Sequence, residues 1–255
     1  MKFSLCIAVF NEEDQIHYPL KSCIDWVDEV VVVDGGSTDK TVQIAQSYGS
    51  KVHVIHADNP AMFHMNKQKA IEAAHGDWIL QLDADEAVDR ELQKEIQSVI
   101  AEDQTHNPVA YWIPRKNYFL NRFLTRGGVY PDMTIRLYKK GVAHFPCKTV
   151  HENVAVNGSV GTLKHDLLHY ADPDFSRYLK RWDRYTSLDA QIAVEKKEHL
   201  CGPCYFFGKP VYTFFMMYFR HRGFVDGFPG FVFALFSAIR YWVIYIKVWQ
   251  INHQK

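Results

Sequence analysis

Three carboxylates stand close together in the segment LQLDADEAV, at the end of an apolar run. Asp83 and Asp85 are two residues apart, so on an extended strand both side chains point to the same side. Hard divalent cations such as Mg²⁺ and Mn²⁺ take carboxylate oxygens as ligands, often together with substrate phosphates. The pair therefore predicts a metal site. The plainer alternative is a solvated turn in which Glu86 and Asp89 favour the start of the next helix.

Alternating strands and helices are predicted to position these carboxylates. The unbroken valine run of residues 29–36 is typical of a parallel strand covered on both faces. Four strand–helix repeats in about a hundred residues predict a parallel sheet with right-handed crossovers, which binds ligands beyond the carboxyl ends of its strands. The predicted strands are 3–10, 29–36, 51–56 and 77–86, and the predicted helices are 11–27, 37–49, 65–76 and 90–102.

The composition is that of a globular chain with an uneven charge distribution. Hydrophobic residues make up 47% of its 255 residues, and the formal net charge is zero. From Ser176 onward there are 12 Lys and Arg against 5 Asp and Glu, whereas the preceding residues carry 17 against 24. An acidic first part and a basic, aromatic last part indicate two surfaces with different partners.

Five scattered cysteines argue against a secreted disulfide framework. The first residues turn acidic without a small-residue cleavage site, so a first strand is predicted here and the cytoplasm is the expected compartment. Cys201 and Cys204 form a C-x-x-C motif with Gly202 and Pro203 between them. Because it follows a long helix and not a strand, a connecting loop is predicted, in preference to a redox or zinc site.

The segments VVVVDGGSTDKT and LQLDADE together resemble the family 2 glycosyltransferases, whose GT-A fold binds a nucleotide-sugar donor. The resemblance is strongest over the first hundred residues. PDMTIRLYKKG, TVHENVAVNG, LLHY and the aromatic C-terminal part are similar to the bacterial lipopolysaccharide-core branch, which includes β-glucosyltransferases.

This resemblance implies roles at the strand ends. Phe10 and Glu12 would border the base and ribose, and Asp34 would accept a hydrogen bond from the uracil ring. Asp83 would lie near the ribose and the metal, and Asp85 would ligate the Mg²⁺ or Mn²⁺ that bridges the two phosphates. Such an ion neutralises the charge that develops as the sugar–phosphate bond breaks.

One departure from the family pattern falls in the helix before the D-x-D strand. Many members carry an Arg-Asn pair there, but here Met65 takes the place of the arginine and Asn66 is retained. Lys67 or Lys69 is expected to supply positive charge to the donor, with a solvated helix face as the alternative for either lysine.

An inverting transfer needs a general base for the acceptor hydroxyl. The family places a carboxylate in the second half of the catalytic domain, which makes Glu152 the first choice and Asp132 the alternative. His151 is expected to bond to Glu152 or to substrate. His169 is a candidate for the metal or the diphosphate, although a packed core histidine is the plainer interpretation.

The predicted organisation is a GT-A domain over 1–172, followed by a helical, aromatic and basic extension over 173–255. Within the first, 1–106 would bind the nucleotide-sugar and 107–172 the acceptor. In residues 211–249, basic side chains interleave with Phe, Tyr and Trp, as in helices that lie at a membrane surface. A core-packed helix or a dimer interface is the alternative.

Together these observations predict an inverting, metal-dependent transferase that moves a sugar, with UDP-glucose as the expected donor, onto a lipid-linked saccharide. The expected partners are that donor, that acceptor and the anionic inner face of the plasma membrane, and no nucleic acid. A non-catalytic saccharide-binding or scaffold protein and a sugar-nucleotidyltransferase are the rivals. The acidic stretch after the first strand disfavours the nucleotidyltransferase, and the missing G-x-G-x-x-G disfavours a dinucleotide oxidoreductase.

Overall fold

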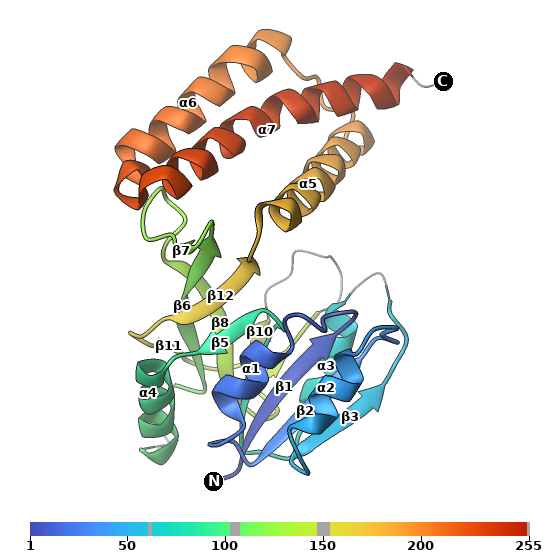
Figure 1. Ribbon diagram of the computed structural model, residues 1–255, viewed down its shortest axis with the longest axis vertical. Coiled ribbons are helices and arrows are strands. Elements are labelled where there is room, and N and C mark those ends of the chain that lie inside the picture. Colours follow the sequence, from blue (N-terminus) through green and yellow to red (C-terminus); the bar gives the residue numbers. More distant parts are fainter. Residues whose placement is uncertain (61–62, 103–107, 147–153, 254–255) are drawn as a thin grey trace. The chain divides into compact units, whose positions relative to one another are not determined.

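The computed structural model describes residues 1–60, 63–102, 108–146 and 154–253 of the chain. Its contacts divide the chain into two units (Figure 1). Unit 1 comprises Met1–Arg115 and Asp132–His169, and unit 2 comprises Lys116–Pro131 and Tyr170–Lys255. The boundary predicted at residue 172 stays a prediction, and the division described here adds the excursion of residues 116–131 to the second unit.

A mixed, mainly parallel sheet forms the centre of unit 1, as predicted. Its strands follow the order β3-β2-β1-β4-β8-β6-β12-β5, and the pairings among the first four are parallel. The strands are ordered differently in the sheet and in the chain. Helices connect the parallel strands, because parallel neighbours need a crossover connection. The bounds are β1 Phe3–Val9, β2 Glu29–Asp34, β3 Val52–His56, β4 Trp78–Leu82, β5 Glu86–Val88, β6 Ala110–Phe119, β8 Asp132–Lys139 and β12 Leu167–Asp172.

Short strands complete the β structure. β11 (Val160–Thr162) pairs parallel with β6, and β7 (Arg122–Phe123) pairs antiparallel with it. β9 (Ala143–His144) and β10 (Ala155–Val156) form a separate two-stranded sheet.

Helices cover both faces of the unit 1 sheet, which is why its central strands are apolar on both sides. Leu5 and Leu80 share one core cluster with residues of α1 (His17–Cys23), α2 (Thr41–Ser47) and α4 (Arg90–Ala101). Cys6 and Ile79, the alternate strand positions, share the other with residues of α3 (His64–Ala73). This alternation confirms the doubly covered sheet that the valine run predicts.

Local signals explain two helix ends. The Asp89 side chain accepts a hydrogen bond from the Leu92 amide at 2.8 Å and so caps the start of α4. Gly49 follows α2 with a φ of 105°, a conformation in which glycine avoids the steric cost of a Cβ. Asp89 therefore favours the next helix as predicted, whereas Glu86 has a different role, described below.

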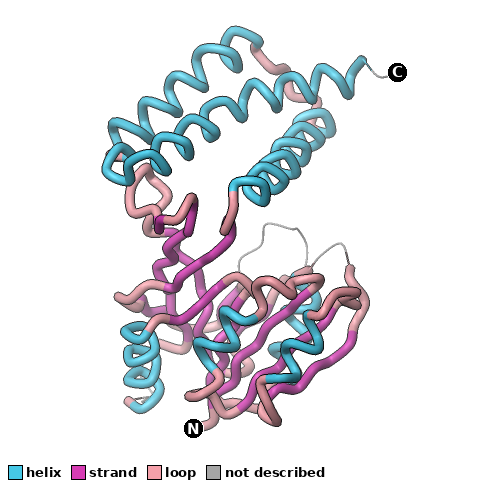
Figure 2. The backbone as a smooth tube through the Cα atoms, in the orientation of Figure 1, coloured by secondary structure: helices cyan, strands magenta, loops and turns pink. Residues whose placement is uncertain are grey.

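Unit 2 is mainly helical (Figure 2). α5 packs against α7, and α7 packs against α6. Rings of the aromatic residues that dominate this sequence interlock, for example Tyr178 with Phe236 at 5.7 Å between ring centroids. The elements are α5 Phe175–Glu195, the π-helical η1 Cys204–Gly208, α6 Lys209–Phe215, the π-helical η2 Met216–Arg220, the 3₁₀ turn η3 Gly223–Asp226 and α7 Gly227–His253.

The interpretation of the C-x-x-C motif as a loop is wrong. Helical structure begins at Gly202, and Cys201 and Cys204 form a disulfide. The sequence pattern did not reveal this helix start, because only a short break separates it from the long helix α5. The free cysteines Cys6 and Cys23 are buried, and burial raises the pKa of Cys23 to about 12, so it is not a reactive thiol.

Two of the basic residues in the aromatic C-terminal part bind to α5. Arg240 forms an ion pair with Asp189, and Lys247 with Asp183 at 2.7 Å. Among the described residues, one helical segment, Gly223–His253, is long and apolar enough by length and composition to cross a membrane, and an 18-residue window within it has a mean hydropathy of 1.6. The ion pairs hold two charges of this segment against a neighbouring helix.

Candidate functional site

The loops that follow β1 and β2 hold each other in place. Thr38 donates its backbone N–H to Asn11 Oδ1 at 2.8 Å, and Glu12 donates its backbone N–H to Thr41 Oγ1 at the same distance. Phe10 lies at this edge with 43% of its surface exposed. The two polar strand ends thus form one structured rim, as expected for the carboxyl edge of a parallel sheet.

Asp34 is buried beneath this rim. Its carboxylate accepts hydrogen bonds from the backbone N–H groups of Gly36 at 3.3 Å and Ser37 at 3.1 Å. Gly36 has a φ of 84°, which allows the tight turn that folds these amides back onto the carboxylate. Asp34 therefore shapes the turn itself, and its contact with a uracil ring stays a prediction.

The two candidate lysines of α3 have different environments. Lys67 is buried and forms an ion pair with Asp83, and its ammonium lies 5.0 Å from the centre of the Phe63 ring. Burial lowers the pKa of Lys67, against the opposing effect of Asp83. Lys69 lies on the exposed face of α3. Asn66 is buried beside them, donates to the Asp58 carbonyl at 2.9 Å and leaves its Oδ1 without a partner among the described residues.

The crowded carboxylates Asp83 and Glu86 bind an arginine. Arg136 donates to Asp83 Oδ2 at 2.6 Å and to Glu86 Oε1 at 2.9 Å. Burial raises the pKa of Asp83, but Arg136 and Lys67 outweigh it and hold that pKa well below its ordinary value. Asp83 is therefore ionised at neutral pH, with cations on both oxygens.

A second arginine extends the cluster. Arg115 donates to the fully buried Glu86 at 3.0 Å and to Asp132 at 2.6 Å. Antiparallel pairing of β6 with β8 places Arg115 directly opposite Asp132. Sequence reasoning missed Arg115, Arg136 and the role of Glu86. The available signal was an arginine between Ile135 and Leu137, in a strand whose neighbouring positions are buried.

Asp85 and His169 form a separate pair. The Asp85 carboxylate lies 3.2 Å from His169 Nε2, and both side chains are largely buried. Antiparallel pairing of β5 with β12 brings them together, since His169 stands opposite Glu86. Burial raises the pKa of Asp85, but the charge and hydrogen bond of His169 outweigh that effect and lower it.

The donor chemistry of this pair fits a divalent ion better than that of Asp83. Carboxylate oxygens ligate Mg²⁺ and Mn²⁺, and imidazole is a common ligand of transition-metal ions, whereas both oxygens of Asp83 are paired with cations. Across the described residues, no group of three or more His, Cys, Asp and Glu side chains is placed to hold a metal. Asp85 and His169 would supply two ligands, and phosphate oxygens of a donor would have to supply others.

A cavity of about 190 Å³ opens beside the cluster. Lys67, Asp83, Arg115 and Arg136 contribute its charged lining, and Phe63 contributes to its apolar wall. The three cations face a small polar space, an arrangement that can stabilise an anionic ligand. Glu152, the preferred base, and His151 lie outside the described residues.

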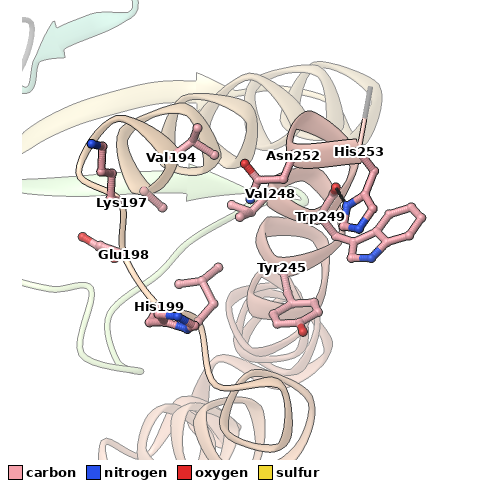
Figure 3. A pocket seen from close by; sticks show the side chains of 11 residues that line it. Val194, Lys197, Glu198, His199, Tyr245, Val248, Trp249, Asn252 and His253 are labelled. Carbon is pink, nitrogen blue, oxygen red and sulfur yellow. Dashed lines mark hydrogen bonds between the residues drawn. The ribbon is translucent and has the colours of Figure 1, made fainter. Parts of the chain in front are cut away.

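Unit 2 contains a different hollow of about 380 Å³, between the end of α5 and the end of α7 (Figure 3). Its wall includes Tyr245 and His253, and the His253 ring stacks on Trp249 with 4.3 Å between centroids. Glu198 is the carboxylate of its lining and stands with Lys197. It therefore lacks the convergent carboxylates of the unit 1 site.

Known proteins resemble this chain in sequence and in fold. The family model described as Glycosyl transferase family 2 matches residues 4–153. These residues contain the strand-end rim, Lys67, the Asp83 and Glu86 cluster and Arg136.

Relatives match the chain over most of its length. An uncharacterized glycosyltransferase of Rickettsia felis is 31% identical, over 93% of this chain and 86% of its own. The lipopolysaccharide core biosynthesis glycosyltransferase LpsC of Rhizobium meliloti is 27% identical, over 98% and 93%. A mannosyltransferase of Pyrobaculum calidifontis, solved with GDP-Man and Mn²⁺, has a similar fold, with a TM-score of 0.55, 12% identity and coverage of 99% of this chain and 88% of its own.

Proposed function

Since the chain belongs to glycosyl transferase family 2 and has a GT-A-like fold, we propose that it is an inverting transferase with a lipid-linked saccharide as acceptor. The proposed donor is UDP-glucose and the proposed acceptor is a lipopolysaccharide inner core. A relative named as a lipopolysaccharide core glycosyltransferase, similar along nearly the whole chain, supports this acceptor class. Two neighbouring features carry the proposal: the Asp85–His169 pair, and the cavity lined by Lys67, Arg115 and Arg136, of which Arg115 acts electrostatically on Asp85.

In this proposal the donor diphosphate lies at the carboxyl edge of the sheet. Asp85 and His169 would hold a Mg²⁺ or Mn²⁺ ion, which supplies Lewis-acid neutralisation of the leaving diphosphate. Lys67 and Arg115 line the adjoining cavity and would add positive charge to the same group. Asp83 and Glu86 hold Arg136 in place, so the cations are fixed before the donor arrives.

The acceptor hydroxyl would attack the anomeric carbon from the face opposite the diphosphate. Its oxygen forms the new bond as the bond from the anomeric carbon to the phosphate oxygen breaks, and its proton passes to a carboxylate. Glu152 is the proposed base and Asp132 the alternative. The Arg115 guanidinium disfavours the alternative, since it donates two hydrogen bonds to Asp132 Oδ2 and so occupies one of the two oxygens that would accept the proton.

A location on the inner face of the plasma membrane is part of the proposal. Unit 2 exposes many large apolar side chains along η1, α6, the α6–α7 turn and α7, among them Phe207, Val211, Phe215 and Phe228. Patches of this kind mark interaction surfaces, and a lipid-linked acceptor resides in the bilayer.

The direct test is transfer to a lipid A-linked inner-core saccharide by the purified full-length chain. With UDP-glucose and Mn²⁺ we expect addition of one hexose, seen by mass spectrometry, and a β linkage in the NMR spectrum. GDP-mannose and UDP-N-acetylglucosamine serve as competing donors. An α linkage from the α-linked donor would contradict inversion, and donor binding without any transfer would indicate a non-catalytic saccharide-binding protein.

Glu152→Gln should lower kcat by roughly 10²-fold or more and leave donor affinity unchanged, because it removes the proton acceptor but keeps the shape. Single-turnover transfer and donor titration measure the two effects. Glu91→Gln, at an exposed position of α4, is the matched control. If Asp132→Asn lowers kcat and keeps its melting temperature while Glu152→Gln transfers normally, the roles of the two carboxylates are reversed.

A further inference from the structure

The turn between α6 and α7 is locked to a distant loop of the same unit. Asp226, 1% exposed, accepts hydrogen bonds from Thr125 N at 2.9 Å and Arg126 N at 2.8 Å. Gly127 donates its backbone N–H to the His221 carbonyl at 2.9 Å. Residues of the 116–131 excursion therefore have a fixed position against the helical turn, and the surface they share is preformed.

A hollow of about 320 Å³ lies on this shared surface. Gly128, with a φ of 76°, allows the loop to approach closely, since a Cβ there would lie 3.4 Å from the His221 ring. The side chains that line the hollow are all basic or neutral: Thr125, Arg126, Tyr130, Arg220, His221 and Arg222.

The three arginines of the hollow differ from three other arginines of unit 2, which form ion pairs. Arg122 pairs with Asp226, Arg181 with Asp172 and Arg240 with Asp189. By contrast, within the part of the chain that the structure describes, the guanidinium groups of the three lining arginines have no carboxylate partner. Like charges gathered around one hollow repel one another, and a bound anion would relieve that repulsion.

The arginine side chains that line the hollow are suited to binding a phosphate group. Guanidinium groups bind phosphate oxygens through paired, charge-assisted hydrogen bonds, and a tyrosine hydroxyl can add a neutral donor. Arg222 has a φ of 56°, so it occupies the left-handed region that few non-glycine residues adopt. Such conformations concentrate at binding sites, where the surrounding structure enforces them.

The exposed phenylalanines around the hollow favour a lipid over a soluble molecule as the source of that phosphate. The same turn exposes Phe219 (49%) and Phe224 (48%), and the start of α7 exposes Phe228 (70%). A soluble phosphate ester gains nothing from an apolar rim, whereas a phospholipid presents its phosphate directly above acyl chains that accept such rings.

We propose that Arg126, Arg220 and Arg222 form a binding pocket for the phosphate of an anionic phospholipid headgroup, with the phenylalanine rim inserted among the acyl chains. This inference rests on the proposed membrane location and gives it a defined contact point. It also assigns the contact with anionic lipid to these three arginines and not to the basic C-terminal part as a whole, because Arg240 and Lys247 form ion pairs with α5.

The test is sedimentation of the full-length protein with vesicles of phosphatidylcholine alone or mixed with phosphatidylglycerol. The variant Arg126→Gln/Arg220→Gln/Arg222→Gln should bind the anionic vesicles roughly 100-fold more weakly, from about a fivefold contribution of each basic group near the surface. The control Lys180→Gln/Arg184→Gln/Lys196→Gln loses the same charge from exposed positions of α5 and its C-cap, and should change binding by less than about threefold.

The possible failures can be told apart. Full-length protein that ignores both kinds of vesicle at low salt would overturn the membrane location and this inference together. Equal losses in the two triple variants would leave membrane binding in place but overturn the pocket, since net charge alone would explain the result. Saturable binding of glycerol phosphate or inorganic phosphate, with displacement of the protein from vesicles, would overturn the lipid as source.

Discussion

Asp85→Ala should lower the rate of sugar transfer by roughly 10³-fold or more, while the chain stays folded. The neutralisation of leaving-group charge by a bound metal contributes several kcal/mol to catalysis, and each 1.4 kcal/mol corresponds to about tenfold in rate. Because His169 lowers the pKa of Asp85, the carboxylate is ionised at neutral pH and available as a ligand. Initial rates with a saturating donor measure the effect.

Metal binding gives this prediction a second readout. In the presence of UDP, titration with Mn²⁺ followed by electron paramagnetic resonance should show tight binding to the natural chain and weak binding to Asp85→Ala and His169→Ala. Asp25→Ala, on an exposed position of the same unit, is the control and should bind and transfer normally. Full activity of the natural chain in excess EDTA would remove the metal from the mechanism.

Arg136→Met should lower the free energy of unfolding by about 3–5 kcal/mol, the cost of leaving a buried charge without its partner. Arg136 is buried and bonds to Asp83, Glu86 and Gln81, with the last contact at 2.7 Å. Urea denaturation measures the loss. The same substitution at Arg90, on the exposed side of α4, should change stability by less than about 0.5 kcal/mol.

The pH dependence of this loss distinguishes an electrostatic cause from a packing defect. The pKa of Asp83 is lowered in the folded chain, so its contribution is present above the ordinary aspartate value of about 3.9 and disappears as the pH falls further. The stability difference between the natural chain and Arg136→Met should therefore shrink below about pH 4. A constant difference across that range, or a loss under 1 kcal/mol at pH 7, would contradict the electrostatic role.

Local patterns in the sequence were enough to predict the parallel part of the fold. A valine run, alternating helices and glycine stops depend on neighbours in the chain, and they predicted β1 to β4 and α1 to α4. The same reasoning could have distinguished the buried lysine of α3 from the exposed one. Lys67 lies three and four residues before the buried Ala70 and Ile71, whereas Lys69 falls on the opposite face.

Long-range pairings account for what the sequence did not predict. The arginine partners of Asp83 and Glu86 come from β6 and β8, and their identity depends on a strand register that no local pattern determines. The same holds for Arg240 and Lys247, which a helical pattern assigns to a lipid-facing surface and the structure pairs with α5.

The pairing of β5 with β12 sets an order of events for a chain that is still being synthesised. β12 is the last strand before α5, so the ribosome has already made the whole donor half when His169 emerges. Until β12 pairs with β5, Asp85 lacks its histidine, and the edge of a growing sheet is open. Contacts between segments far apart in the chain form slowly, because the intervening loop must first be ordered. Nascent chains stalled before residue 167 should therefore be protected against proteolysis in β1 to β4 and remain inactive, and release of the stalled chain should start activity only after the pairing has formed.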